Sequence, residues 1–365
     1  MFKNLTMFEN FNEFIIFIFI FLIILFFYLH IQYQLKTSSE LEVYEIDQEL
    51  SKERLEEICN LRQPILLDTT EELIQLIEIF NKDYLSSEFS LYDVKIRNKK
   101  NIKTVNDVST PLQIGIAMNL FKKDTGSNYY SENNLDFLNE SNIVKKIRMN
   151  DNILKPFMTC DYNYDFIFGA NNASTPLKYE INYRNYILST GENIKIRLIP
   201  PKYVNYFNIE CDYERMEFIS DANIWNIQPK YEMAMKKVKY IDVDLPTGKI
   251  LFITAYWMYS INLEENGSAL LFTYKTCMNI VSTSPTLLKC FLQRQNTQTN
   301  YLKKITSNDE IAIAIAKKEP NILPATDDEI TKINEEENMM IEKIMKETLE
   351  STPIDDLQPT ASENL

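Results

Sequence analysis

The chain has 365 residues, of which 45% are hydrophobic and 25% charged, so it can form one large domain or two ordinary ones around a true core. Its single histidine, His30, excludes a Ser-His-Asp relay, a Cys-His pair and any site that needs two histidines. Its six glycines are too far apart to form a GxGxxG or Walker A phosphate loop. The net charge of -14 argues against nucleic acid as a partner.

The acidic excess is concentrated near the C-terminal end. From residue 326 onward there are about 12 acidic residues against 3 lysines, whereas the central region is only mildly acidic. The terminal segment, and not the core, therefore sets the overall charge.

The cysteines predict a reduced compartment. They are odd in number, widely spaced and never in a CxxC pair that could begin a zinc or redox site. They are Cys59, Cys160, Cys211, Cys277 and Cys290. We expect them to be buried as small apolar side chains, with a reactive thiol at Cys160 beside Asp161 as the alternative.

An uninterrupted apolar run follows an N-terminal segment of residues 1–13. Residues 14–31 are close to the roughly 20 residues that cross a bilayer, and we predict a single-pass transmembrane helix there. A cleaved signal peptide is the alternative, but its apolar region would be shorter and no small-x-small cleavage site follows. A buried soluble helix is a weaker alternative, because the run has no polar face.

The orientation of this helix is weakly determined. Lys3 and Lys36 balance each other across it. The unpaired cysteines favour a soluble domain that faces the cytosol. Four Asn-x-Ser/Thr sequons would permit glycosylation if the domain were in a lumen, and they begin at Asn4, Asn139, Asn172 and Asn266.

Two helical regions are predicted before the first strands. Residues 32–58 form an acidic, helix-like juxtamembrane linker. Residues 69–84 have apolar side chains at helical spacing and open with a capping box formed by Thr69 and Glu72.

From about Asp165 the apolar period changes to two. Short alternating stretches separated by Asn, Gly, Pro and acidic turns predict about eight antiparallel strands in a barrel or sandwich. They are 166–170, 177–183, 185–189, 193–199, 240–245, 249–257, 259–263 and 269–276.

Beyond Ile305 the sheet pattern stops. Residues 326–350 predict an amphipathic acidic helix that opens with a capping box formed by Thr326 and Glu329. Its apolar stripe can pack back on the domain, which is the commoner case, or bind a protein partner. Residues 351–365 predict a disordered acidic tail.

Two ordered motifs resemble the cupin-like branch of the JmjC-type 2-oxoglutarate oxygenase family. Phe166 to Pro201 contains FGANNASTPLKYE and ends in LIPP, and Asp242 to Leu263 contains DLPTGKILFITAYW. Arg62 to Leu67 (RQPILL) is similar to an early segment of the family. The resemblance implies that residues 59–305 form a cupin-like JmjC-type domain. The fold class expected is therefore mainly β with flanking helices, a double-stranded β-helix (cupin, jelly-roll) domain behind an N-terminal transmembrane helix.

The resemblance also implies the positions of the family's metal ligands, two histidines and one carboxylate that bind Fe(II). In this chain Lys178 and Tyr259 stand at the two histidine positions, and Glu180 stands at the carboxylate position. An ammonium group and a neutral phenol are poor Fe(II) ligands, and no other histidine lies beyond His30. We therefore expect no metal and no catalytic residue at these vestigial positions.

The co-substrate site implied by the resemblance is altered as well. Thr175 matches the family threonine that helps to bind 2-oxoglutarate, but Lys195 is offset by about one residue from the family lysine. A one-residue slip on a strand turns a side chain to the opposite face. We expect Thr175 and Lys195 to be vestigial co-substrate positions and expect no cofactor.

Lys178 and Glu180 are two residues apart on a predicted strand and so point to the same face. We hypothesise that the Lys178 ammonium replaces the metal and neutralises Glu180, with Tyr259 completing a buried cluster. The alternative is an exposed charge pair that contributes almost nothing.

These observations predict a membrane-anchored, catalytically inactive pseudo-JmjC protein that acts as a binding or structural scaffold. The alternative is an oxygenase-like enzyme with an unconventional or metal-free site, in which Lys178 is a base and Glu180 or Tyr259 an acid. A third possibility is a structural component of a membrane or particle, because the combination of features is similar to proteins of large DNA viruses.

Overall fold

The computed structural model describes residues 2–46, 51–101 and 109–295, with side chains from Glu13 onward. The helix expected at 326–350, the tail at 351–365 and the last residues of the domain expected at 59–305 lie outside the described residues. The domain of described strands begins earlier than residue 59, at Tyr44.

The helix predicted for the apolar run at 14–31 is confirmed, but it is part of one longer continuous helix, α1 (Phe2–Leu35), which also includes most of the N-terminal segment expected at 1–13. Its segment Glu13–Leu35 is long and apolar enough to cross a membrane, and an apolar window of 18 residues within it is not buried by the rest of the protein, whereas Gln34 near its end is buried. The same properties fit an anchor and a signal sequence.

The larger sheet has nine strands in the order β1-β2-β14-β9-β16-β6-β5-β3-β4. All of its pairs are antiparallel except the parallel pair of β1 and β2. The strands are β1 (Tyr44–Ile46), β2 (Ile65–Asp68), β3 (Asp93–Asn98), β4 (Thr110–Gln113), β5 (Tyr129–Ser131), β6 (Thr159–Gly169), β9 (Arg184–Ser189), β14 (Lys249–Thr254) and β16 (Ser268–Thr276).

The smaller sheet has seven strands, six of them in the order β11-β12-β8-β15-β10-β13, with β7 paired to β15. All of its pairs are antiparallel. The strands are β7 (Ala173–Ser174), β8 (Leu177–Tyr179), β10 (Ile194–Ile199), β11 (Ile209–Asp212), β12 (Glu217–Ser220), β13 (Ile241–Leu245) and β15 (Met258–Leu263).

All eight stretches predicted from the period of two are strands in the structure, namely β6, β8, β9, β10, β13, β14, β15 and β16. The prediction of a mainly β domain with flanking helices is confirmed. The remaining strands are mostly short, and four or fewer residues carry too little alternation to be recognised.

The expectation that residues 32–58 form a helical linker is wrong for residues 36–46, since α1 ends at Leu35. The helix α2 (Lys52–Cys59) occupies only the end of that range. Residues Tyr44–Ile46 form a strand that pairs with Ile65–Leu67, because the sheet edge offers backbone partners to this segment.

The amphipathic helix predicted at 69–84 is present but is divided and starts one residue later than the capping box implies. The helices are α3 (Glu71–Ile79), with Thr70 as its N-cap, and α4 (Lys82–Glu88). The Thr69 hydroxyl donates instead to the carbonyl oxygen of Gly248. The Thr69 hydroxyl is therefore hydrogen-bonded to the turn before β14 and does not cap α3.

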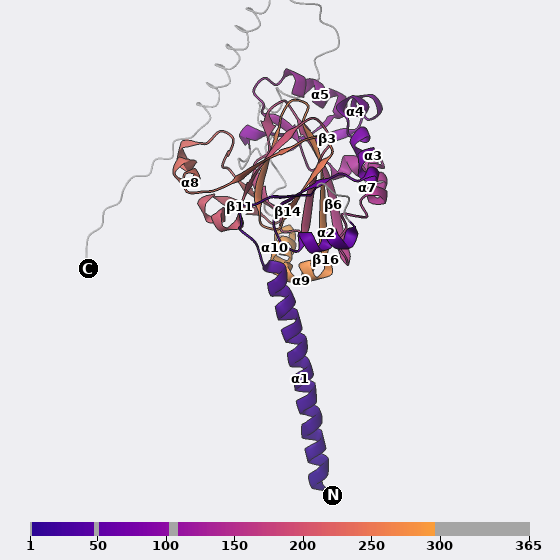
Figure 1. The fold of residues 1–365 in the computed structure, drawn as a ribbon, viewed down its shortest axis with the longest axis vertical. Helices are drawn as coiled ribbons and strands as arrows, with labels where there is room; N and C mark the ends of the chain where they lie inside the picture. Colours follow the sequence, from indigo (N-terminus) through magenta and orange to yellow (C-terminus); the bar gives the residue numbers. More distant parts are fainter. Residues whose placement is uncertain (1, 47–50, 102–108, 296–365) are drawn as a thin grey trace, which may run out of the picture. The chain divides into compact units, whose positions relative to one another are not determined.

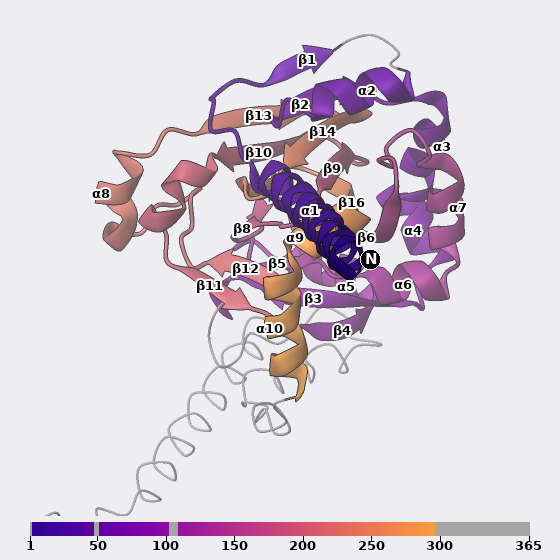
Figure 2. The same cartoon turned by 90° about the horizontal axis from the view of Figure 1, so that it is seen from below.

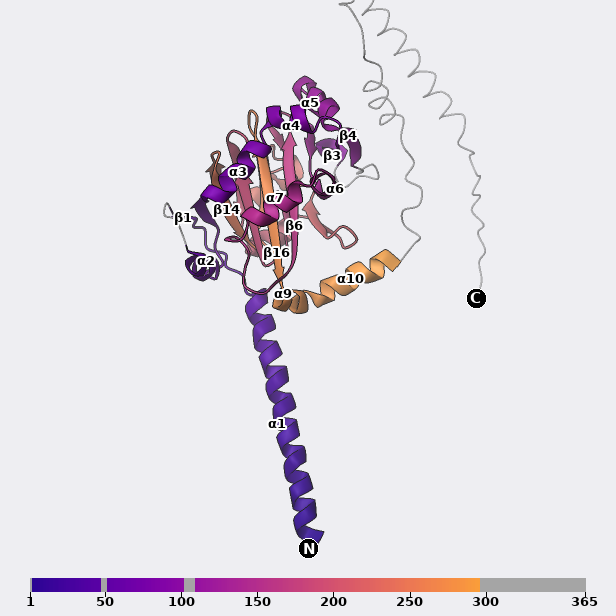
Figure 3. The same cartoon turned by 90° about the vertical axis from the view of Figure 1, so that its right-hand side faces the viewer.

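Helices cover the outer face of the larger sheet. Figures 1 and 3 show α3 and α7 against the strands β6, β16 and β14, and α8 lies on the other side of the domain in Figures 1 and 2. The remaining helices are α5 (Ile114–Lys123), α6 (Leu135–Glu140), α7 (Ile143–Asn150), α8 (Glu232–Met235), α9 (Cys277–Ser282) and α10 (Ser284–Gln295), with short 3-10 turns at Lys99–Asn101, Pro201–Tyr206 and Pro229–Tyr231.

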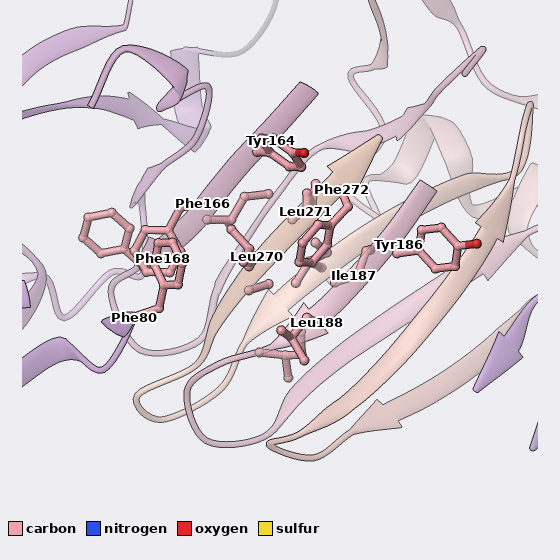
Figure 4. Close-up of a cluster of buried hydrophobic side chains, with 14 of the residues drawn as sticks. Phe80, Tyr164, Phe166, Phe168, Tyr186, Ile187, Leu188, Leu270, Leu271 and Phe272 are labelled. Atoms are coloured by element: carbon pink, nitrogen blue, oxygen red, sulfur yellow. The ribbon is translucent and has the colours of Figure 1, made fainter. Parts of the chain in front are cut away.

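Aromatic side chains of β6 join the larger sheet to these helices (Figure 4). The ring of Phe166 lies 4.6 Å from that of Phe80, at the end of α3, and 4.8 Å from that of Phe168. All three side chains are fully buried. Burial of each such ring contributes about 1.5–3 kcal/mol, so this contact holds the helical layer on the sheet.

The smaller sheet is covered on both faces. Side chains of β10 such as Ile196 and Leu198 belong to the main core, whereas Leu177 of β8 and Met258 of β15 belong to a second cluster with residues 199–238. Because side chains alternate along a strand, Lys178 and Tyr259 point from the smaller sheet toward the main core. The fold thus places both residues in the protein interior.

The expectation of unpaired cysteines is wrong for two of the five. Cys160 and Cys277 form a disulfide, with their Cα atoms 5.5 Å apart. Cys59 and Cys290 are free and buried, as expected, and Cys211 is free and exposed. The pairing could not be read from the sequence because the two residues are 117 positions apart.

Candidate functional site

The two residues at the expected histidine positions are direct neighbours. Tyr259 of β15 lies opposite Lys178 of β8 in the antiparallel pairing of these strands. Both side chains are buried, and the Lys178 ammonium nitrogen lies 5.8 Å from the centre of the Tyr259 ring. The structure therefore places Lys178 and Tyr259 together, as the resemblance predicts.

Lys178 forms an ion pair with Glu132 and not with Glu180. Its Nζ lies 3.1 Å from Oε2 of Glu132, whose side chain is only 1% exposed. Glu132 directly follows β5, so it enters the interior from the larger sheet. The hypothesis that Lys178 is in a buried cluster is confirmed, whereas the partner assigned to it was wrong.

Glu132 is shared by a second cation. Nη1 of Arg97, on β3, lies 2.6 Å from Oε1 of Glu132 and 3.2 Å from Oε1 of Glu217. The Tyr130 hydroxyl also donates to Oε1 of Glu132, at 3.2 Å. Each oxygen of this carboxylate thus has a cationic donor, as a buried charge requires.

The ionisation states of this pair follow from their surroundings. Burial would raise the pKa of Glu132, but the charges of Lys178 and Arg97 lower it to about 2. Burial would likewise lower the pKa of Lys178, but the charge of Glu132 and the neighbouring Tyr259 and Glu180 raise it well above its usual value. Lys178 is therefore a protonated cation at neutral pH.

Glu180 lies two residues beyond Lys178 and is partly exposed. The Tyr259 hydroxyl donates to its Oε1 at 3.5 Å, and Nδ2 of Asn182 donates to its Oε2 at 3.4 Å. Both hydrogen bonds are long, so they stabilise the carboxylate weakly. Burial raises the pKa of Glu180 to about 7, in spite of the nearby Lys178 charge.

A second carboxylate, Asp165 of β6, lies in the same region. It accepts backbone N–H groups of Asn133 at 2.9 Å and Asn134 at 2.8 Å. Burial still raises its pKa to about 6. The site thus contains two carboxyl groups that titrate near neutral pH beside a fixed ion pair.

These groups line a cavity of about 150 Å³. Its wall contains Asp165, Lys178, Glu180 and Glu217, with Asn133 and Asn182 supplying amide groups. The volume is sufficient for several waters or a very small ligand. The charged residues of the lining are of both signs, with four carboxylates and three basic side chains, so a small hydrogen-bonding ligand would suit it.

The residues present do not fit the Fe(II) that the resemblance implies. Of the three positions, only Glu180 offers a carboxylate oxygen, because Lys178 is protonated and burial raises the pKa of Tyr259. Within the part of the chain that the structure describes, no group of three or more His, Cys, Asp or Glu side chains is arranged to hold a metal ion. The side chains at these three positions are therefore suited to ion pairs and hydrogen bonds in the protein interior, and not to the ligation of Fe(II).

The two expected co-substrate residues do not join this cluster. Thr175 is buried, and its Oγ1 accepts the backbone N–H of Ile261 at 2.9 Å, which ties the start of β8 to β15. Lys195 is exposed on the opposite face of β10 from Ile194 and forms an ion pair with Glu264. The one-residue slip has therefore turned Lys195 away from the interior.

A larger cavity of about 520 Å³ lies at the other end of β8. Thr175, Lys99 and Gln228 are among its lining residues. Lys99 donates to the Ser174 hydroxyl, and burial lowers the pKa of its ammonium group. This cavity can take a larger small-molecule ligand than the cavity beside Lys178, which has room only for waters or a very small ligand.

Sequence reasoning missed Glu132 and Arg97, which complete the cluster. Both lie before the first motif, in a region where only the early RQPILL segment carried a resemblance. No local signal marked Arg97 as buried, because Asp93, Lys95 and Arg97 alternate with the apolar Val94 and Ile96 as charged residues on an exposed strand face would.

Comparison of the chain with models of protein families gives no match, and comparison with curated proteins gives none either.

Proposed function

We propose that this protein is a catalytically inactive, cupin-like (pseudo-JmjC) protein that acts as a binding or structural scaffold at a membrane. The chain changes sheet repeatedly along the motif region, as in a jelly roll, although β10 to β13 all lie in the smaller sheet. Strands β6, β9, β14 and β16 lie in one sheet, and β8, β10, β13 and β15 lie in the other. This alternation supports the double-stranded β-helix that the resemblance implies.

The observation that carries the proposal is the ion pair of Lys178 with Glu132. The Lys178 ammonium stands where the resemblance places the first metal ligand, and it is 3.1 Å from a carboxylate that Arg97 also neutralises. A cation supplied by the chain itself therefore takes the electrostatic role of a metal. Insertion of Fe(II) would require this buried pair to be broken, which costs several kcal/mol.

The test is the thermal stability of the full-length chain in detergent micelles with Fe(II), Mn(II) and 2-oxoglutarate. We expect no bound metal and no change in Tm. The double variant Lys178→His with Tyr259→His serves as the matched comparison, because it restores the family's donor types at both positions. Stoichiometric metal in the unchanged protein, with a rise in Tm that Glu180→Gln abolishes, would overturn the proposal.

A metal-free enzyme is the second candidate, and the raised pKa of Glu180 favours it. A carboxyl group with a pKa of about 7 beside a cavity is suited to general acid or base catalysis. In this version Glu180 is the proton-transfer residue and Lys178 is not a base, since its pKa is raised. A small ligand that raises the Tm of the unchanged protein but not of Glu180→Gln would support this candidate.

Membrane attachment rests on α1. A retained anchor keeps the protein in the membrane fraction after alkaline carbonate washing, with an N-terminal tag still present. A cleaved signal sequence loses the tag and releases the protein. The retained form is the result we expect, because no cleavage motif follows residue 31.

The acidic segment 326–365 is the proposed contact for a protein partner. Its sequence combines a predicted apolar stripe with a strong negative charge. Affinity capture with the full chain and with a chain ending at residue 325 tests this. Loss of a captured protein in the shorter chain supports the contact, and identical captured proteins would contradict it.

A further inference from the structure

The disulfide of Cys160 with Cys277 follows from an irregularity in the sheet. In the pairing of β6 with β16 the partner of Lys275 is Asp161, whereas the partner of Thr276 is Thr159. Cys160 is therefore the extra residue of a β-bulge, which re-aims a side chain out of the regular alternation. Cys277 is the first residue of α9, and the 5.5 Å between the Cα atoms lies in the usual range for a disulfide.

A disulfide of this kind forms and persists in oxidising compartments and is rare in the cytosol. Its formation oxidises two thiols, releasing two protons and two electrons to a thiol-disulfide oxidoreductase of that compartment. The prediction of a cytosol-facing domain rested on unpaired cysteines. It loses this support because Cys160 and Cys277 are paired. The disulfide points to the opposite orientation.

The three sequons of the folded domain provide an independent observation. Asn139 lies near the end of α6, Asn172 in the turn after β6 and Asn266 in the turn before β16, and all three residues are exposed. Asn172 and Asn266 have left-handed backbone φ values of 59° and 54°, typical of tight surface turns. A glycan on any of these three asparagines would extend into solvent.

Two of these sequons lie far from the segment that crosses the membrane. α1 contacts α9, which directly follows β16 (Figure 3). Asn266 precedes the other end of β16, and the 9 residues of that strand span about 30 Å. Asn172 follows the end of β6 that pairs with the start of β16. Both asparagines are therefore well separated from the bilayer surface.

We infer that the β domain faces an oxidising lumen or the cell exterior and carries N-linked glycans on Asn139, Asn172 and Asn266. The donor class is a lipid-pyrophosphate-linked oligosaccharide. The Asn side-chain nitrogen forms a bond to the anomeric carbon and loses one proton, while the sugar–phosphate bond breaks and the lipid pyrophosphate leaves with the electron pair. The inference requires α1 to be inserted in a membrane during synthesis, whether or not it is cleaved afterward.

The fourth sequon is an internal control. Asn4 precedes the apolar segment of α1, so it lies on the other side of the membrane from the domain when α1 crosses once. Luminal placement of the domain leaves Asn4 unmodified. The reverse orientation makes Asn4 the single sequon in the lumen.

The experiment is translation of the full-length chain with microsomes derived from endoplasmic reticulum, followed by digestion with an endoglycosidase. We expect three glycans, each removed singly by Asn139→Gln, Asn172→Asp or Asn266→Asp, and no change with Asn4→Gln. Aspartate is used at the two turn positions because it tolerates left-handed φ better than glutamine. Modification of Asn4 alone, or an unglycosylated domain that added protease digests in intact microsomes, would overturn the inference.

The thiols give a second readout that does not depend on glycosylation. In unreduced protein a membrane-permeant maleimide should label the free Cys211 and leave Cys160 and Cys277 unlabelled. Cys160→Ser should free Cys277 for labelling, and Cys211→Ser serves as the matched control. Labelling of both Cys160 and Cys277 in the unreduced full chain would contradict an oxidising location.

Discussion

Tyr259 lies directly opposite Lys178 across β15 and β8, and the ammonium nitrogen is 5.8 Å from the centre of the tyrosine ring. This distance allows a cation–π contact, which adds about 0.5–2 kcal/mol when it is desolvated. The Tyr259 hydroxyl also reaches Glu180, at 3.5 Å. The side chains at the positions where the resemblance implies metal ligands thus interact with one another and with their neighbours.

Removal of the buried cation should destabilise the domain. Lys178→Ala leaves Glu132 with Arg97 as its remaining cationic partner among the contacts described, and we expect a loss of about 3–5 kcal/mol in the free energy of unfolding. Urea denaturation followed by circular dichroism measures this loss. Lys195→Ala is the matched control, because its exposed pair with Glu264 should contribute little to stability. Equal effects of the two substitutions would contradict a buried role for Lys178.

Glu180 should make the protein less stable as the pH rises. Its pKa is about 7 in the folded state against an ordinary value of 4.5, so the folded state binds more protons between these limits. The free energy of unfolding therefore falls from about pH 4.5 to pH 7, and Asp165 adds to this fall up to about pH 6. Glu132 affects the free energy of unfolding in the opposite direction. Its carboxylate stabilises the folded state at neutral pH, and this stabilisation is lost only as the pH falls toward about 2.

Glu180→Gln isolates this effect. It should be close to neutral at pH 4.5 and stabilising at pH 8, by about 1–3 kcal/mol, because the variant has no carboxylate to desolvate. Chemical denaturation at both pH values provides the measurement. Glu57→Gln, at an exposed position of α2, is the matched control for the removal of a carboxylate. A stability difference that is the same at pH 4.5 and pH 8 would show that Glu180 titrates normally.

Gly191 should not tolerate alanine. A Cβ atom there would lie 2.3 Å from the backbone oxygen of Asn266 and 2.7 Å from the backbone nitrogen of Ser268, so the turn between β9 and β10 would have to move. We expect a loss of about 1–3 kcal/mol, as for other overpacked sites. Gly115→Ala is the control, since its nearest contact would be an ordinary 3.5 Å and α5 would gain helix propensity. The comparison is the Tm of the two variants by calorimetry, and a similar Tm for both would refute the close approach.

The disulfide should stabilise the domain through its long loop. Cys277→Ser should lower the free energy of unfolding by about 2–5 kcal/mol, because the cross-link joins residues 117 positions apart. Dithiothreitol should lower the Tm of the unchanged protein to that of the variant and leave the variant unaffected. Cys211→Ser should not change the Tm. Insensitivity of the unchanged protein to reduction would show that the bond does not contribute.

Several expectations depended only on local sequence and could be made without the structure. The alternation of apolar residues located eight strands, and the apolar run located α1, because periodicity and length are properties of a continuous segment. The same local reasoning assigned Thr69 to a helix cap. It failed there because Gly248, remote in sequence, accepts the hydrogen bond of that hydroxyl.

The amino-acid sequence by itself determined the chemistry that is possible here. One histidine and the order of Lys178, Glu180 and Tyr259 fix which side chains stand at the expected metal positions. Only the tertiary structure decided how those side chains are paired, since Glu132 comes from 46 residues before Lys178 and Cys277 from 117 residues after Cys160. Ion pairs and disulfides depend on distances in space, and the antiparallel pairing of remote strands sets these distances without any local sequence signal.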